Sequence, residues 1–298
     1  TLGLIGDEAL HKVKPEVRII NAARGGIVDE QALYDALVDG RVAGAGLDVY
    51  ATEPCTDSPL FSLDTVVATP HLGASTDEAQ EKAGISVARS VRLALGGELV
   101  PDAVNVQGGV LAEPVRPLLP LAEKLGAIAS KLSGAAIERI DVEVQGEAAG
   151  EDVRVLELSA LKGVFGQLVD DPVSYVNAPI MAKNRGVEVH LSTTPDSADH
   201  RSVVTVRTTQ VDGGRVCVAG TVVGPRDEAR LVQIDEFDVE VAITDHMAFL
   251  GYVDRPGVVG KLGQILGDAG INIAGMQVGR TDAGGRALTV LTVDSAVP

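Results

Sequence analysis

Three polar side chains of different chemistry stand out near the start of the chain: Arg24, Glu53 and His71. Each follows a short apolar run of the kind that forms a buried parallel strand, at residues 17–20, 45–49 and 66–68. Because side chains just past the strand ends of an open α/β sheet face the ligand crevice, we expect the three to meet in one cleft. A guanidinium grips a carboxylate, an imidazole moves a proton and a carboxylate orients the imidazole. Together they are suited to reducing a 2-oxo acid.

The composition is that of a globular protein and argues against two classes of partner. The 298 residues include 25 basic and 42 acidic side chains, and the net charge of −17 repels nucleic-acid phosphates and anionic lipid. No stretch of the sequence approaches the roughly 20 apolar residues of a membrane span. Cys55 and Cys217 lack the spacing of a metal site, so we expect no metal and a reduced, cytoplasmic environment.

The periodicity of apolar residues predicts alternating strands and helices up to residue 73 and α+β units beyond it. Helices are expected at residues 7–13, 30–39, 76–94, 121–132, 153–168, 175–184 and 258–269. Further strands are expected at residues 140–144, 187–191, 203–208, 215–222, 249–253, 271–278 and 287–293. Thr76 has the side chain of a helix N-cap, and Gly108 and Gly109 close an expected linker.

These elements divide the sequence into four segments. We expect the end of an α/β domain, a helix with a linker, an α+β domain, and a short β-α-β-β unit, at residues 1–73, 74–108, 109–243 and 244–298. The chain opens on Thr1 without a Met, and no G-x-G-x-x-G fingerprint follows a strand. We therefore expect a fragment truncated at both ends, with the Gly-rich loop upstream and a closing helix and strand missing after Pro298. A complete small domain is the alternative.

Three motifs resemble those of the D-isomer-specific 2-hydroxyacid dehydrogenases. They are Asn-Ala-Ala-Arg-Gly-Gly at residues 21–26, Asp-Val-Tyr-Ala-Thr-Glu-Pro at 48–54 and Pro-His-Leu-Gly-Ala-Ser-Thr at 70–76. Asp-Arg-Pro-Gly-Val-Val-Gly at 254–260 resembles an ACT domain, a small ligand-binding module, and Tyr-Val-Asn-Ala-Pro at 175–179 resembles the intervening domain of long family members. The resemblance implies a partial, doubly wound, Rossmann-like α/β domain that binds NAD, then an α+β intervening domain, then a partial ACT domain of ferredoxin-like βαββ topology.

The resemblance also implies roles for individual residues. Arg24 would grip the substrate, His71 would be the acid–base, and Glu53 would hold the imidazole and keep it protonated during reduction. Asp48 would contact the nicotinamide amide, and the full set of implied NAD contacts is Ala22, Ala23, Arg24, Asp48, His71, Gly73 and Ala74. In the ACT unit, contacts to L-serine are implied for Tyr252, Asp254 and Asn272, at a site formed where ACT domains pair across subunits.

The function implied by the resemblance is NAD-dependent oxidation of D-3-phosphoglycerate to 3-phosphooxypyruvate, the first step of phosphorylated L-serine synthesis. Feedback by L-serine through the ACT domain and a homotetramer are implied with it. Two alternatives stay open: another D-2-hydroxyacid, with 2-oxoglutarate or glyoxylate as the reduced substrate, and a non-catalytic scaffold that senses NAD(H). Without the Gly-rich loop, the chain by itself is expected to be inactive.

Overall fold

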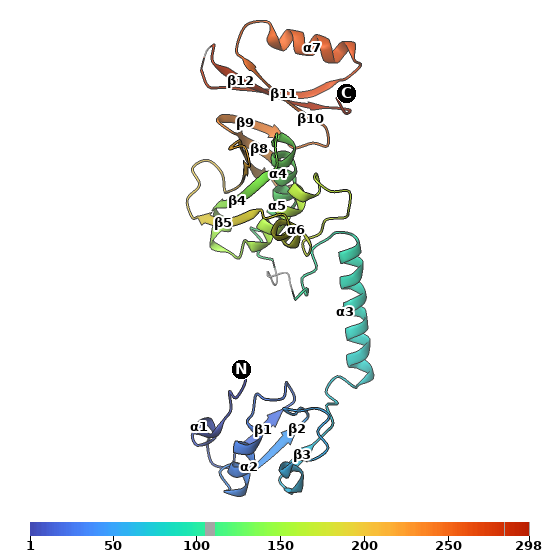
Figure 1. Ribbon diagram of the computed structural model, residues 1–298, viewed down its shortest axis with the longest axis vertical. Coiled ribbons are helices and arrows are strands. Elements are labelled where there is room, and N and C mark those ends of the chain that lie inside the picture. The colour runs from blue at the N-terminus through green and yellow to red at the C-terminus, as the bar shows by residue number, and fades with distance from the viewer. Residues whose placement is uncertain (105–110, 283, 298) are drawn as a thin grey trace. The chain divides into compact units, whose positions relative to one another are not determined.

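The computed structural model describes residues 1–104, 111–282 and 284–297 (Figure 1). It divides into two compact units, Thr1–Arg89 and Ser90–Pro298. The expected boundary at residues 108 and 109 lies outside the described residues, and the other domain boundaries stay predictions.

The first unit is a parallel three-stranded sheet in the order β1-β2-β3, with short helices against one face. Its elements are α1 (Asp7–Leu10), β1 (Arg18–Asn21), α2 (Glu30–Val38), β2 (Gly44–Leu47), the 3-10 turn η1 (Pro59–Ser62) and β3 (Val66–Ala68). Leu10, Leu33 and Leu60 are almost completely buried and fill the space between the sheet and the helices. The three parallel strands confirm the α/β prediction, while α1 is shorter than expected.

The other face of this sheet is open. Ile20 is 79% exposed and Val67 is 70% exposed, although both lie in runs that were expected to be buried. The expectation of burial is wrong for these two side chains, because α1, α2 and η1 pack on the opposite face of the sheet. Parallel sheets normally bury both faces.

Helix α3 (Asp77–Leu95) starts in the first unit and ends in the second. Its predicted cap is present, since the Thr76 hydroxyl oxygen accepts a hydrogen bond from the Ala79 amide at 3.2 Å. None of its residues is buried.

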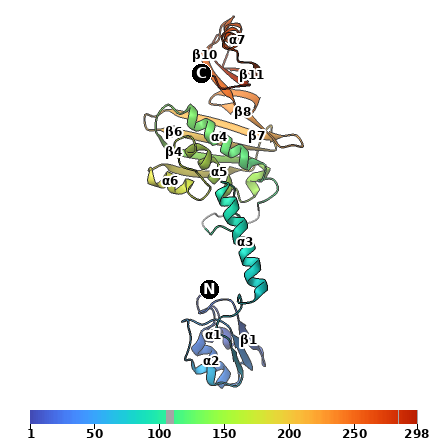
Figure 2. The same cartoon turned by 90° about the vertical axis from the view of Figure 1, so that its right-hand side faces the viewer.

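The second unit contains a six-stranded sheet in the order β5-β4-β6-β7-β8-β9, antiparallel except for the β4–β5 pair. Its elements are α4 (Leu118–Leu132), β4 (Ile137–Gly146), the 3-10 turn η2 (Glu147–Gly150), α5 (Arg154–Phe165), α6 (Ala178–Asn184), β5 (Glu188–Thr194), β6 (Ser202–Gln210), β7 (Arg215–Val223), β8 (Glu228–Ile234) and β9 (Phe237–Ala242). Helices α4 and α5 lie together over the sheet (Figure 2). Ile140, Val142 and Val144 are fully buried in this core, which confirms β4 as a strand with one solvated face.

Two glycines let α4 and α5 pack at backbone distance. A Cβ atom on Gly126 would lie 2.1 Å from the carbonyl oxygen of Ala160, and one on Gly163 would lie 1.9 Å from that of Glu123. No side chain fits in either gap, so glycine at both positions sets the separation of the two helices.

Strands β8 and β9 form a hairpin that the sequence pattern did not predict. Asp235 at its turn has a φ of 49°, in the left-handed region that favours glycine. Its carboxylate accepts a hydrogen bond from the Cys217 amide at 2.8 Å, which ties the turn to β7. The turn lacks the Asn-Gly or Asp-Gly pair that usually signals a two-residue hairpin, and this absence explains the omission.

The C-terminal part forms a three-stranded antiparallel sheet in the order β10-β12-β11 with one helix. Its elements are β10 (Met247–Val253), α7 (Val258–Asp268), β11 (Ile273–Arg280) and β12 (Arg286–Val293). Leu266, Ile271 and Leu291 form its core. The βαββ order agrees with the sequence prediction.

Candidate active site

The loop after β1 carries Arg24 and is fixed by the side chain of Asn21. Asn21 is 6% exposed; its Nδ2 donates to the Arg24 carbonyl oxygen at 3.0 Å, and its Oδ1 accepts from the Ala23 amide at 3.2 Å. The sequence pattern did not assign a role to Asn21. The available signal was its type, because Asn at a strand end commonly bonds the backbone of the following turn.

Gly25 brings this loop against the one that follows β2. A Cβ atom at residue 25 would lie 1.8 Å from the Tyr50 carbonyl oxygen. The loops of Arg24 and Glu53 are therefore in direct backbone contact, which places the two side chains at the same edge of the sheet.

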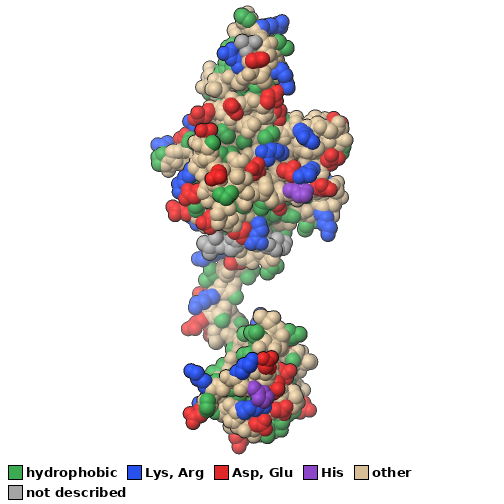
Figure 3. Space-filling view, turned by 90° about the vertical axis from the view of Figure 1, so that its left-hand side faces the viewer, with side chains coloured by type: hydrophobic (Ala, Val, Ile, Leu, Met, Phe, Trp, Pro, Cys, Tyr) green, Lys and Arg blue, Asp and Glu red, His purple; other side chains and the backbone are tan. Residues whose placement is uncertain are grey.

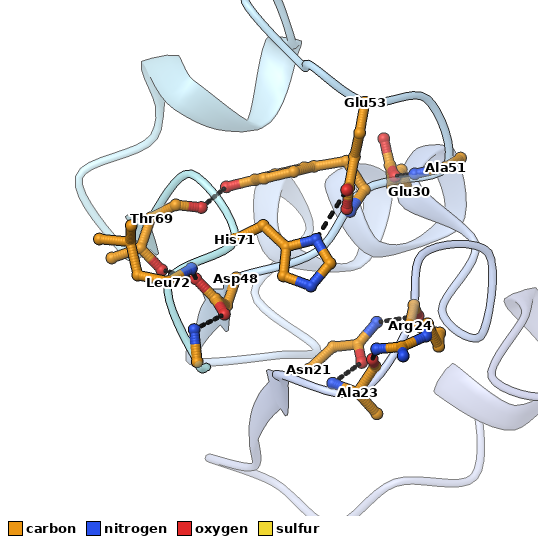
Figure 4. A network of polar contacts seen from close by, with 12 residues as sticks. Asn21, Ala23, Arg24, Glu30, Asp48, Ala51, Glu53, Thr69, His71 and Leu72 are labelled. Atoms are coloured by element: carbon orange, nitrogen blue, oxygen red, sulfur yellow. Dashed lines mark hydrogen bonds and ion pairs between the residues drawn. The ribbon is translucent and has the colours of Figure 1, made fainter. Parts of the chain in front are cut away.

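Glu53 and His71 form the central pair of the site (Figure 4). His71 Nδ1 lies 2.7 Å from Glu53 Oε2, and Glu53 Oε1 accepts from the Tyr50 amide at 3.0 Å. Because a carboxylate can only accept, Nδ1 carries the proton of this contact, and Nε2 is left to exchange a proton with a substrate. The hydrogen bond from His71 lowers the pKa of Glu53, as do the Tyr50 amide and the charges of His71 and Arg24.

Arg24 lies at the same edge of the sheet as Glu53 and His71. Its guanidinium donates to the neighbouring Ala23 carbonyl oxygen at 2.8 Å and is otherwise exposed. Its charge helps to lower the pKa of Glu53, so the two groups interact electrostatically. The structure thus brings together the three side chains that the sequence predicted would meet: a cation, an acid and an imidazole.

Asp48 is buried and accepts three hydrogen bonds from the loop that carries His71. Its Oδ1 accepts from the Thr69 hydroxyl at 2.6 Å and the Leu72 amide at 2.7 Å, and its Oδ2 accepts from the Gly73 amide at 2.8 Å. The Thr69 hydroxyl, the Leu72 amide and the Gly73 amide lower the pKa of Asp48 in that order of strength, against the opposing effect of burial.

The other residues expected to contact NAD lie in the loops that carry Arg24 and His71. Ala22 and Ala23 follow β1, Gly73 and Ala74 follow His71, and all four are exposed. Small, exposed residues at the carboxyl ends of parallel strands leave backbone open to a flat ring, so these positions suit a nicotinamide. The individual contacts stay predictions.

The three residues expected to bind L-serine are not brought together within one chain. The Asp254 amide donates to the Gly285 carbonyl oxygen at 2.8 Å, beside the start of β12, whereas the Asn272 side chain donates to Asp294 at 2.8 Å, beyond its end. The eight residues of β12 span about 25 Å. Tyr252 lies near the Asp254 end, where its hydroxyl is 2.9 Å from Thr289 Oγ1.

In the part of the chain that the structure describes, no group of three or more metal-ligating side chains occurs. No described helix is long and apolar enough to cross a bilayer. Figure 3 shows acidic and basic side chains interspersed over the visible face rather than gathered in a basic patch.

Comparison with known families matches three models to the chain. They are the NAD binding domain of the D-isomer specific 2-hydroxyacid dehydrogenases at residues 1–73, the intervening domain of D-3-phosphoglycerate dehydrogenase at 114–235, and the ACT domain at 246–298. The chain thus carries domains that match the D-isomer specific 2-hydroxyacid dehydrogenases, the intervening domain of D-3-phosphoglycerate dehydrogenase among them. The matches follow the order of domains inferred from the sequence.

Three similar curated proteins are named D-3-phosphoglycerate dehydrogenase. The D-3-phosphoglycerate dehydrogenase of Mycobacterium tuberculosis is 52% identical over 298 residues, which cover 100% of this chain and 56% of that protein. Those of Synechocystis and Methanocaldococcus jannaschii are 39% and 36% identical, and the matches cover 54% and 56% of their lengths. The chain therefore spans little more than half the length of these relatives. A solved glyoxylate reductase from Paecilomyes thermophila is 40% identical over 33% of this chain and 30% of its own, with a TM-score of 0.32.

Proposed function

We propose that the protein, in its full encoded length, oxidises D-3-phosphoglycerate to 3-phosphooxypyruvate with NAD, in the cytoplasm. The observation that carries the proposal is the 2.7 Å contact between Glu53 and His71 beside Arg24 at the strand ends. The substrate is inferred from the accompanying domains, because the relatives that match the chain across both the intervening and the ACT domains are named D-3-phosphoglycerate dehydrogenases.

The chemistry at the site follows from the atoms that are free. Ala22, Ala23, Gly73 and Ala74 are the exposed residues that would line the nicotinamide end of NAD, which when bound would supply the acceptor for the hydride of the hydroxyl-bearing carbon. His71 Nε2 takes the hydroxyl proton during oxidation and returns it to the carbonyl oxygen during reduction. Glu53 stabilises the imidazolium because it faces Nδ1 as a carboxylate. Arg24 offers its planar fork to the substrate carboxylate and carbonyl.

Regulation by L-serine and a homotetramer belong to the same proposal. Asp254 and Asn272 lie at opposite ends of β12, too far apart to hold one small amino acid within a single chain. Pairing of ACT domains from two chains would bring one residue of each kind together. This separation supports an effector site that is shared between subunits, and so an oligomer.

The test uses the full encoded protein and follows NADH consumption with 3-phosphooxypyruvate, glyoxylate and 2-oxoglutarate, each with and without L-serine. We expect 3-phosphooxypyruvate to have the highest kcat/KM and L-serine to inhibit its reduction. The variants Arg24→Lys and His71→Asn should lose at least about 100-fold in kcat/KM. His11→Asn is the matched control, because His11 is an exposed histidine of the same unit outside the site.

Each alternative has its own result in this assay. Preference for glyoxylate or 2-oxoglutarate would assign the enzyme to another 2-hydroxyacid. NADH binding without turnover of any oxo acid would indicate a sensor. Retention of normal turnover in Arg24→Lys would refute the role given to Arg24, and fast turnover that ignores L-serine would remove the regulatory part alone.

A further inference from the structure

His71 has a backbone conformation that its own side chain does not favour. Its φ is 58°, in the left-handed region, where a residue other than glycine is strained. Such a conformation persists only when the surrounding structure imposes it. The groups that hold the residues before and after His71 therefore determine where its imidazole lies.

Thr69, two residues before His71, is held at three points. Its amide donates to the Leu47 carbonyl oxygen at 2.9 Å, and its hydroxyl donates to Asp48 Oδ1 at 2.6 Å. Its carbonyl oxygen accepts from the Tyr50 hydroxyl, 3.1 Å away, and Tyr50 is only 6% exposed. Together these contacts fix the end of β3 to the end of β2.

The residues after His71 are held by the same carboxylate. Asp48 accepts from the amides of Leu72 and Gly73, so one buried acid contacts the chain on both sides of His71. Tyr50 supports both members of the Glu53–His71 pair. Its amide donates to Glu53, and its hydroxyl donates to the carbonyl oxygen of Thr69, two residues before His71. His71 and Glu53 thus share one support.

We propose that Thr69 and Tyr50 are positioning residues that, through Asp48, hold His71 in its left-handed conformation and keep Nδ1 against Glu53. Neither side chain is placed at the substrate or the cofactor. The inference rests on the proposed function, because its effect is measured through proton transfer at His71. Asp48 then has a structural role, because its oxygens hold the loop of His71, in addition to the nicotinamide contact implied by the family resemblance.

The test compares variants of the full encoded protein in the reduction of 3-phosphooxypyruvate. Thr69→Val removes the hydroxyl donor at nearly constant shape, and we expect kcat to fall about tenfold with the KM for 3-phosphooxypyruvate within about twofold, because Arg24 is untouched. Thr69→Ser keeps the hydroxyl and should restore kcat to within about twofold. Tyr50→Phe should lower kcat about threefold.

Matched controls make the same chemical changes elsewhere in the unit. Thr65→Val alters an exposed threonine just before β3, and Tyr34→Phe alters a tyrosine of α2 whose hydroxyl has no hydrogen-bond partner among the described residues. Both should keep the parental kcat. With NADH deuterated at the transferred position, Thr69→Val should show a larger isotope effect than the parent, which a general loss of stability would not produce.

The outcomes separate the inference from the function on which it rests. If Thr69→Val and Tyr50→Phe fold and lose no more kcat than their controls, or if Thr69→Ser fails to restore kcat, the positioning role is refuted. If the parent protein reduces no oxo acid, the proposed function fails, and the positioning role is then tested by the NMR signals of the His71 ring nitrogens. A changed or broadened His71 signal in Thr69→Val supports the positioning role, and an unchanged signal refutes it. If Thr69→Val does not fold, Tyr50→Phe and Thr69→Ser give the same decision.

Discussion

Replacement of Gly25 by alanine tests whether the contact between the two loops sets the active-site geometry. The new Cβ would lie 1.8 Å from the Tyr50 carbonyl oxygen and 2.2 Å from its carbonyl carbon, and both are backbone atoms. An ordinary contact needs about 3.4 Å, so the loop would have to retreat by about 1.5 Å. Arg24 is the preceding residue and would move with it.

The size of the expected effect follows from that displacement. A shift of roughly 1 Å in a positioned catalytic group costs about 100-fold in rate, or about 2.7 kcal/mol of transition-state stabilisation. We therefore expect Gly25→Ala to lower kcat/KM for 3-phosphooxypyruvate by about 100-fold in the full encoded protein. Overpacking should also cost about 1–3 kcal/mol of the free energy of unfolding.

The control separates loss of stability from loss of geometry. Gly40 has a φ of 77°, and a Cβ added to it would meet no atom within 4 Å, so Gly40→Ala introduces backbone strain in the same unit without a steric clash. It should lower stability by about 1 kcal/mol and leave kcat/KM unchanged. The reasoning would be refuted if Gly25→Ala kept kcat/KM within about threefold of the parent, measured by NADH consumption, with an unchanged thermal midpoint.

Two further changes have definite expected outcomes. The pKa of Asp48 is lowered in the folded state, so its ionised form stabilises the fold above the ordinary carboxyl range, and this contribution is lost as pH falls through the lowered pKa. In urea titrations, the difference in free energy of unfolding between the parent and Asp48→Asn should therefore be largest near neutral pH and shrink in acid. A difference that grew in acid would contradict the direction of this pKa shift. In the second unit, Gly163→Ala places a Cβ 1.9 Å from the Glu123 carbonyl oxygen and should lower the thermal midpoint, with a loss of about 1–3 kcal/mol in the free energy of unfolding. Gly150→Ala, with open space around it, should leave the midpoint unchanged. Equal midpoints of the two variants in calorimetry would show that α4 and α5 can separate freely.

The sequence was sufficient to predict that the three proposed catalytic side chains lie at one edge of the sheet. Arg24, Glu53 and His71 each follow a strand-forming run, and parallel strands bring their carboxyl ends to one edge, so their convergence needs no knowledge of loop conformation. What the sequence could not show was how the loops are held. The roles of Asn21 and Thr69 depend on which backbone atoms come within hydrogen-bond distance, and residue type alone does not reveal this.

The features of the rest of the fold that the sequence did not predict have similar causes. The hairpin of β8 and β9 turns at Asp235, whose left-handed conformation is supported by a contact to the neighbouring strand rather than by local turn residues. The exposure of Ile20 and Val67 depends on which face of the sheet the helices cover, and an apolar run gives no information about that. Local patterns predicted the elements, while contacts between distant residues decided these details.

The distance between Asp254 and Asn272 has a consequence for how inhibition depends on protein concentration. If each effector site takes one of these residues from each of two chains, then the sites exist only in the associated form, and their number follows the association equilibrium by mass action. Each proposed active site, by contrast, takes Arg24, Glu53 and His71 from a single chain. Dilution would then release the enzyme from L-serine before it removed the catalytic residues from one another, and L-serine itself would favour association by binding only to paired chains.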